Sequence, residues 1–155
     1  MGVHHALTAA GIPFRVHEHP PIRTEADLHL TGLDLNRSVK TLAFETPDGS
    51  LVLAGLPGLW RARYAAIAAA VGVSRTQLRP AGPERLAAVG MQPGGVSPVC
   101  ADPAALVLLD ASLPGSGRVY CGGGSADTTL ELDVDDLLRV GARSLVAPIA
   151  QPQDR

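Results

Sequence analysis

The sequence predicts one α+β domain around a mixed β-sheet. Stretches with a strand pattern and stretches with a helical pattern are mixed along the chain without strict βαβ alternation. The chain has 155 residues, 46% of them apolar, which is enough to bury the core of one compact domain. We find no linker or internal repeat, and we expect the domain to span residues 1–150, with a frayed tail at 151–155.

The helices that we expect begin or end at capping residues, and they span 3–10, 25–30, 60–71, 75–78, 83–90 and 134–140. Thr24, Ser74 and Asp133 are suitable N-caps because their side-chain oxygens accept bonds from free amides of the first turn. Gly11 and Gly72 are suitable stops because glycine readily adopts the left-handed conformation.

The expected strands span 14–19, 38–46, 51–56, 105–109, 118–121 and 128–132. Residues 14–19 alternate between apolar and polar, as in a half-buried strand. The turn Pro47-Asp48-Gly49 between two apolar stretches predicts a β-hairpin. Residues 105–109 are continuously apolar, which indicates a strand buried on both faces.

Composition excludes several classes of function. The net charge is −2 and only five residues are aromatic, so neither a large contact with duplex phosphates nor a stacking platform for single strands is expected. A small contact with one end of a nucleic acid stays possible. Two cysteines make no disulfide framework, and we find neither a membrane span nor a signal peptide. We therefore expect a cytoplasmic protein that does not bind membranes.

The basic residues are twelve arginines and a single lysine, Lys40. A coding bias that favours arginine would leave a lysine where a compact point charge is required. Taken alone, the presence of a single lysine is explained equally well by chance.

For the paired histidines and the two cysteines, a structural role is a better interpretation than a functional one. His17 and His19 share one face of the first strand, but no third ligand is apparent, so we expect no metal. Cys100 and Cys121 are better interpreted as small buried residues than as nucleophiles. The sequence contains no nucleophile elbow, P-loop or His-Glu-x-x-His motif.

Two glycine-rich loops, 93–98 and 122–127, would allow backbone amides to approach a ligand closely. Each alone could be a plain turn. Together with Lys40 they predict a shared pocket, with the Lys40 amine facing residues 94–98.

Three ordered elements carry a resemblance to a known family: Ser38-Val-Lys-Thr-Leu-Ala-Phe44, Gly94-Gly-Val-Ser-Pro98, and Asp110-Ala-Ser-Leu followed by Gly122-Gly-Gly124. Over residues 19–138 the chain resembles the YbaK/EbsC family of bacterial aminoacyl-tRNA editing domains, which are related to the insertion domain of prolyl-tRNA synthetase. The resemblance implies a mixed, curved sheet with flanking helices. It also implies hydrolysis of the ester between a wrong amino acid and the 3′ adenosine of a tRNA, without metal or cofactor.

The resemblance assigns the main functional role to Lys40 and the lining of the aminoacyl pocket to residues 94–98. Our candidate set is catalytic Lys40 and, for substrate binding, Thr41, Gly94, Gly95, Val96, Ser97, Pro98, Gly123, Gly124, Asp127 and His19. Thr41 and the small, acidic segment 124–127 depart from the family pattern. Because relatives act on Cys-, Ala- and Ser- or Thr-type substrates, the amino acid stays open.

The chemistry is consistent with these residues. An aminoacyl ester is already activated, so its hydrolysis needs orientation, stabilisation of the oxyanion and a placed water, and no protein nucleophile. The expected function is a free-standing deacylase that acts on esters of small amino acids, with overlapping activity on Ala and Ser. Two alternatives are a non-catalytic module that binds the CCA end or docks on a synthetase, and an esterase that acts without tRNA. The expected partners are the tRNA acceptor end and a synthetase.

Overall fold

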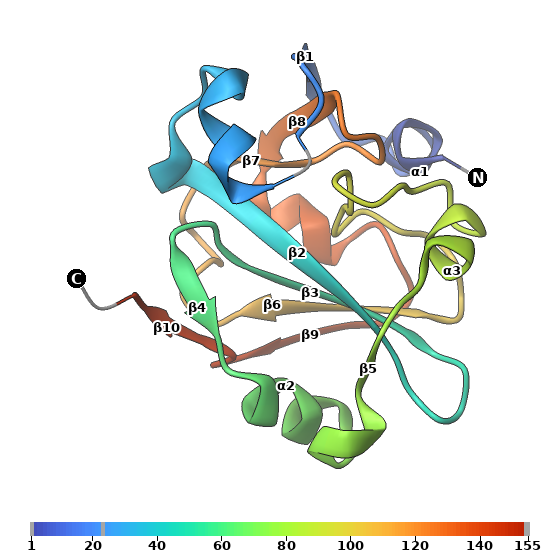
Figure 1. Ribbon diagram of the computed structural model, residues 1–155. Coiled ribbons are helices and arrows are strands. Elements are labelled where there is room, and N and C mark those ends of the chain that lie inside the picture. The colour runs from blue at the N-terminus through green and yellow to red at the C-terminus, as the bar shows by residue number, and fades with distance from the viewer. Residues whose placement is uncertain (1, 23, 154–155) are drawn as a thin grey trace.

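The computed structural model describes residues 2–22 and 24–153. Within them the main sheet has eight strands (Figure 1): β1 (Arg15–Glu18), β2 (Ser38–Glu45), β3 (Leu51–Pro57), β5 (Arg79–Pro80), β6 (Ala105–Asp110), β7 (Arg118–Gly122), β8 (Thr128–Asp133) and β9 (Ser144–Ala147). Their order is β1-β8-β7-β2-β3-β6-β9, and β5 pairs with the end of β2. The sheet is mixed, because β2–β7, β3–β6 and β6–β9 are parallel and the other pairs are antiparallel.

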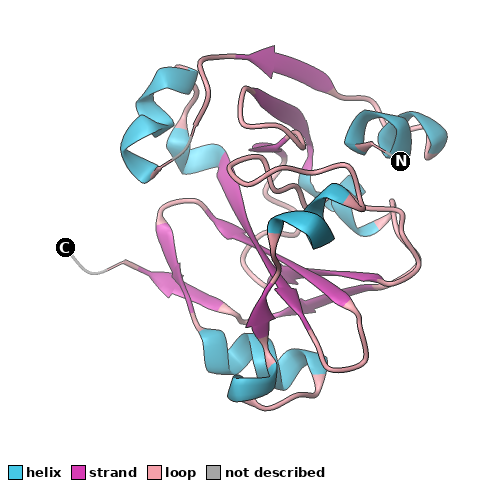
Figure 2. Ribbon diagram, turned by 45° about the vertical axis from the view of Figure 1, so that its right-hand side comes forward, coloured by secondary structure: helices cyan, strands magenta, loops and turns pink. Residues whose placement is uncertain are grey.

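A second, two-stranded sheet joins β4 (Trp60–Ala62) to β10 (Ala150–Pro152). The helices are α1 (Val3–Ala9), α2 (Tyr64–Val71) and α3 (Pro83–Ala87), with short 3-10 turns η1 (Glu25–Thr31), η2 (Leu35–Arg37), η3 (Arg75–Gln77) and η4 (Val134–Leu138). Figures 1 and 2 place α2 with η3 at the bottom of the molecule and η1 at the top left, beside the start of β2. This is the expected α+β domain with a mixed sheet and flanking helices.

The sheet separates two hydrophobic cores. Leu51 and Leu53 of β3 contact the larger core under α1, α3 and η4, whereas Val52 and Ala54 contact the smaller core under α2. This division follows from the two-residue period of a strand. Every residue of β6 is buried, which confirms the expectation of a strand covered on both faces.

A buried carboxylate ties the end of the chain to the sheet. Asp110 Oδ1 accepts hydrogen bonds from the backbone amides of Ile149 (2.9 Å) and Ala150 (3.0 Å). Its other oxygen accepts a bond from the Ser112 amide at 3.1 Å. The third element of the family resemblance therefore has a structural role at this position.

The prediction of a helix from Trp60 is wrong for its first turn. Residues 60–62 form β4, and the helix begins only at Tyr64. The Arg63 amide donates to the carbonyl of Ile149, so pairing with a distant segment overrides the local helical spacing.

Smaller differences concern the ends of elements. Gln151 and Pro152, expected in a frayed tail, belong to β10, while residues 154–155 lie outside the described residues. The helices expected at 25–30 and 134–140 are short 3-10 turns, capped by Thr24 and Asp133 as predicted. In the described part of the chain, no helix is long and apolar enough to cross a membrane.

Candidate functional site

A pocket of about 320 Å³ opens where the first residues of β2 meet four other segments of the chain. The residues that form its wall are His19, Ile22, Thr24, Leu28, Thr31, Leu33, Leu35, Ser38, Val39, Lys40, Thr41, Gly58, Gly94, Val96, Tyr120, Gly122, Ala126, Thr128 and Thr129. Apolar side chains dominate the part contributed by the segment from the end of β1 to the start of η2: Ile22, Leu28, Leu33 and Leu35. The pocket therefore combines an apolar wall with the polar start of β2.

Lys40 supplies the positive charge of the pocket. It lies in β2, opposite Leu56 of β3, and its side chain is half-buried. Among the described residues it has no ion pair and no hydrogen bond through its side chain, and no carboxylate lines the pocket. An ammonium group without a partner in a partly apolar cavity favours the binding of an anion or of a developing negative charge.

Thr41 follows Lys40 and also lines the pocket. Its hydroxyl oxygen is buried and has no hydrogen-bond partner among the described residues. Because a buried hydroxyl without a partner costs free energy, such a group is often found where a ligand completes it.

His19 also lines the pocket, and two hydrogen bonds hold its ring in one orientation. Its Nδ1 lies 2.9 Å from the carbonyl oxygen of Pro20, which can only accept, so Nδ1 carries the proton. In the neutral ring Nε2 then accepts a bond from the Thr129 hydroxyl, 2.8 Å away. The pocket thus contains a histidine–threonine pair with a defined tautomer.

The loop at 93–98 approaches the pocket through Gly94 and Val96. Gly94 has a φ of +85°, and a Cβ at this position would lie 2.5 Å from the carbonyl oxygen of Ile22. A side chain at residue 94 would therefore disturb the backbone of the opposite wall. Ser97 is fully buried, and its Oγ accepts a bond from the Val99 amide at 3.1 Å. Contrary to expectation, Ser97 is not part of the pocket wall.

The two glycine-rich loops contact each other through their backbones. The Gly124 amide donates to the Gly95 carbonyl at 2.8 Å, and the Gln92 amide donates to the Gly124 carbonyl at 2.7 Å. A Cβ on Gly95 would collide with the backbone of Ser125, and one on Gly122 with the carbonyl of Val96. Glycine is therefore required in both loops for close packing behind the pocket.

The candidate residues fall into two groups. Five of them line the pocket together: His19, Lys40, Thr41, Gly94 and Val96. The others lie outside the wall: Gly95, Ser97, Pro98, Gly123, Gly124 and Asp127. Asp127 is exposed, and its backbone carbonyl accepts a bond from the His19 amide at 3.0 Å.

Sequence reasoning missed the apolar wall and the hydroxyl groups on β8. Ile22, Leu28, Leu33 and Leu35 looked like ordinary residues of a short helix and loop. Thr128 and Thr129 looked like strand residues, although their position directly after the second glycine-rich loop placed them near the pocket. That position was the one available signal.

An ion cluster lies beside the pocket, on β1, β7 and β8. Glu131 accepts from Arg118 Nε at 2.9 Å and pairs with His17 Nε2 at 2.8 Å. These two partners, Arg118 first, lower the pKa of the Glu131 carboxyl. His17 is therefore engaged away from the pocket, and within residues 2–22 and 24–153 no three His, Cys, Asp or Glu side chains gather as a metal site would require.

The two cysteines are buried, as predicted. Burial raises the pKa of the Cys121 thiol to about 12, and it also raises the pKa of Cys100. Neither thiol is available as a thiolate nucleophile near neutral pH.

Comparison with known proteins agrees with this architecture. The model of the aminoacyl-tRNA editing domain family matches residues 19–140, and the chain therefore belongs to this family. None of the curated proteins compared with the chain matches it.

Solved structures extend the likeness to almost the whole chain. A structure described as a proposed trans-editing enzyme for prolyl tRNA synthetase is 28% identical, with a TM-score of 0.77 over 96% of this chain and 94% of that one. The hypothetical protein APE2540 is 27% identical, with a TM-score of 0.77 over 96% of this chain and 99% of that one. The fold of the YbaK family is thus present from α1 to β10.

Proposed function

We propose that this protein is an aminoacyl-tRNA deacylase that acts in trans and hydrolyses the ester of tRNAs mischarged with a small amino acid. The observation that carries the proposal is Lys40, whose ammonium group has no partner among the described residues and which lines a pocket that is otherwise largely apolar. Membership of the editing-domain family supports it. The relative described as a proposed trans-editing enzyme for prolyl tRNA synthetase supports action in trans and makes that synthetase the first partner to test.

In this proposal Lys40 stabilises the oxyanion that develops on the ester carbonyl, or holds the phosphate of the terminal adenosine. The backbone at Gly94 and Val96 fixes the aminoacyl group, and a water molecule attacks the carbonyl carbon. The His19–Thr129 pair is suited to orient this water, because the neutral ring accepts the threonine proton and leaves the threonine oxygen free to accept another. No protein nucleophile takes part.

The size of the pocket supports the choice of a small amino acid. About 320 Å³ lies at the lower end of the roughly 300–1,000 Å³ of ligand pockets. The apolar wall excludes large side chains sterically, but one methylene changes discrimination by only about 1–3 kcal/mol. We therefore expect overlapping activity on Ala and Ser esters.

The decisive experiment is a deacylation panel with tRNAs mischarged with Ala, Ser, Cys and Thr. We expect multiple turnovers on Ala- and Ser-tRNA, little activity on larger esters, and the same rates after exhaustive chelation. Binding of these tRNAs without turnover would show that the protein is a non-catalytic module that holds the CCA end. Activity that is lost on chelation and restored by zinc would assign His17 and His19 to a metal.

A further inference from the structure

The basic residues are distributed unevenly, although the net charge is only −2. Residues 49–83 contain four arginines and neither aspartate nor glutamate: Arg61, Arg63, Arg75 and Arg79. All four are exposed, and none forms an ion pair with a described residue. A small net charge is therefore compatible with a basic surface, whose arginines lie in β4, just before α2, in η3 and in β5.

The geometry of this surface is regular near β4. Arg61 lies in β4, and Arg63 follows with an extended backbone, so their side chains leave the same face of the chain. Their Cα atoms are about 6.6 Å apart, a spacing that suits successive phosphates of a nucleic-acid strand. The Arg75 guanidinium lies over the Tyr64 ring, 4.8 Å from its centre, which holds a third positive charge beside α2.

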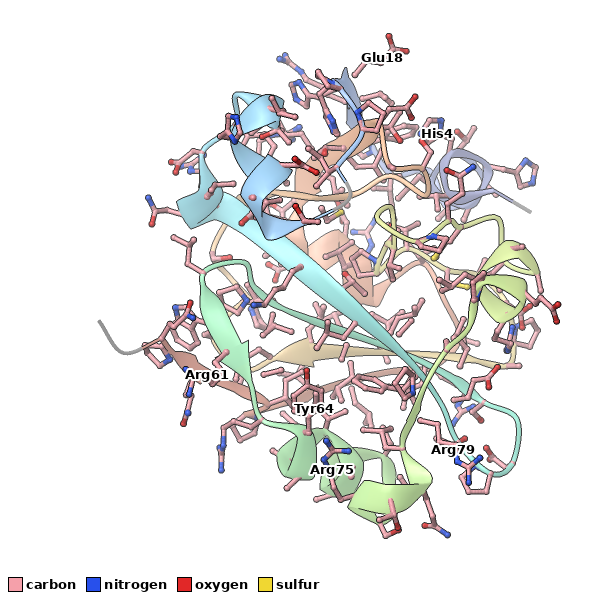
Figure 3. The ribbon with its side chains drawn as sticks, viewed as in Figure 1. His4, Glu18, Arg61, Tyr64, Arg75 and Arg79 are labelled. Atoms are coloured by element: carbon pink, nitrogen blue, oxygen red, sulfur yellow. The ribbon has the colours of Figure 1, made fainter. Side chains whose placement is uncertain are left out.

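The surface begins a few residues from the pocket. Gly58 lines the pocket, and three residues of chain place Arg61 at most about 11 Å away. Figure 3 shows Arg61, Tyr64 and Arg75 on the side of the molecule formed by β4 and α2, whereas His4 and Glu18 lie at the opposite end. A chain whose end occupies the pocket can therefore continue over β4.

We propose that Arg61, Arg63 and Arg75 form a track that binds the phosphates of the tRNA acceptor strand leaving the pocket. This inference rests on the proposed function, which places the aminoacylated 3′ end in the pocket. Arginine forks match phosphate oxygens, and such contacts position a nucleic acid without reading its sequence. An acidic surface of a partner protein is the other ligand that these arginines could bind. RNA is favoured because the arginine surface continues from the pocket.

The test measures binding of uncharged tRNA by fluorescence anisotropy, which does not depend on catalysis. The variant combines Arg61→Glu and Arg63→Glu, and the matched control is Arg15→Glu on β1, which is also exposed and has no ion pair with a described residue. We expect the double variant to lose at least roughly tenfold in affinity at low salt. The slope of log affinity against log salt should fall by about 1.4–1.8 for two contacts, with no such change for Arg15→Glu.

A second measurement separates the track from the pocket. Hydrolysis of a 3′-aminoacyl adenosine, which lacks the preceding phosphates, should proceed at the wild-type rate in the double variant, while kcat/KM on mischarged tRNA falls. Equal tRNA affinity and an equal salt slope in wild type, control and double variant would overturn the proposed track. If the double variant instead lost the ability to bind a synthetase, the surface would be a docking site for a protein. A wild-type protein that hydrolyses neither substrate would refute the proposed function, while the anisotropy result would still decide the track.

Discussion

The two ends of β2 differ in how their polar groups are satisfied. At the start of the strand, Lys40 and Thr41 line the pocket, and neither the Lys40 ammonium nor the buried Thr41 hydroxyl has a partner among the described residues. At its end, Phe44 is buried under α2, and Glu45 forms an ion pair with Arg85. At one end of the strand the protein itself supplies the partners of the polar groups, whereas at the other end a ligand would supply them. Substitutions at the two ends should separate activity from stability.

The largest effect on activity is expected for Lys40→Ala. In the proposed function this charge faces the ester, so its loss should lower the deacylation rate roughly 10²–10³-fold, as for other groups that stabilise an oxyanion. The melting temperature should hardly change, because Lys40 makes no ion pair with a described residue. Single-turnover deacylation and thermal unfolding measure the two quantities. Lys40→Arg should also lose most activity, and a wild-type rate in this variant would contradict the need for a point charge.

Phe44→Ala tests the other end of the strand. Phe44 is 5% exposed, and its ring forms a T-shaped pair with the Tyr64 ring at a centroid distance of 6.0 Å. Its truncation should lower the free energy of unfolding by about 3–5 kcal/mol. The rate per folded molecule should stay close to wild type. Denaturant titration checks the first statement, and an equal loss of activity and stability would remove the distinction between the two ends.

Gly95→Ala probes the contact between the two glycine-rich loops. The new methyl group would collide with the Ser125 backbone, so one loop must move, at a cost of about 1–3 kcal/mol. Since Gly94 and Val96 line the pocket, we expect the rate on the larger of two esters to fall first. The ratio of rates on Ala- and Ser-tRNA measures this. An unchanged ratio with both rates reduced would mean that the loop positions the carbonyl and does not select the side chain.

Thr41→Val compares a hydroxyl without a partner with one that has a partner. Removing the Thr41 hydroxyl should leave stability equal or raise it by up to about 1 kcal/mol, because no bond within the described residues is lost. Thr129→Val removes the hydrogen bond to His19 and should lower the free energy of unfolding by about 1 kcal/mol. Chemical denaturation of both variants gives the comparison. A clear destabilisation by Thr41→Val would show that its hydroxyl is already satisfied.

The smallest effect is expected at Glu131, a satisfied group beside the pocket. Its pKa is lowered by Arg118 and His17, so its contribution to stability is present above about pH 4.3 and is lost as the pH falls through the lowered pKa. The melting temperature of Glu131→Gln should therefore lie below that of wild type near pH 7 and approach it at strongly acidic pH. A difference that does not depend on pH would contradict an ionic origin.

The sequence predicted most of what local patterns determine. The turn at Pro47-Asp48-Gly49 and the apolar period of β2 and β3 predicted the hairpin. The fact that the chain has a single lysine singled out Lys40, which lines the pocket, while its catalytic role stays a prediction. Features that depend on distant contacts were missed. Trp60 entered a strand because its partner lies about 90 residues away, and Leu28 and Leu33 became a pocket wall only through the fold.

The pairing of β4 with β10 has a consequence for synthesis of the protein. Residues 60–62 have no strand partner until residues 150–152 have been added. At about 5–20 residues per second, translation of the intervening chain takes about 5–18 s. The segment with Arg61 therefore gains its strand partner long after β2 and β3 are able to pair with each other.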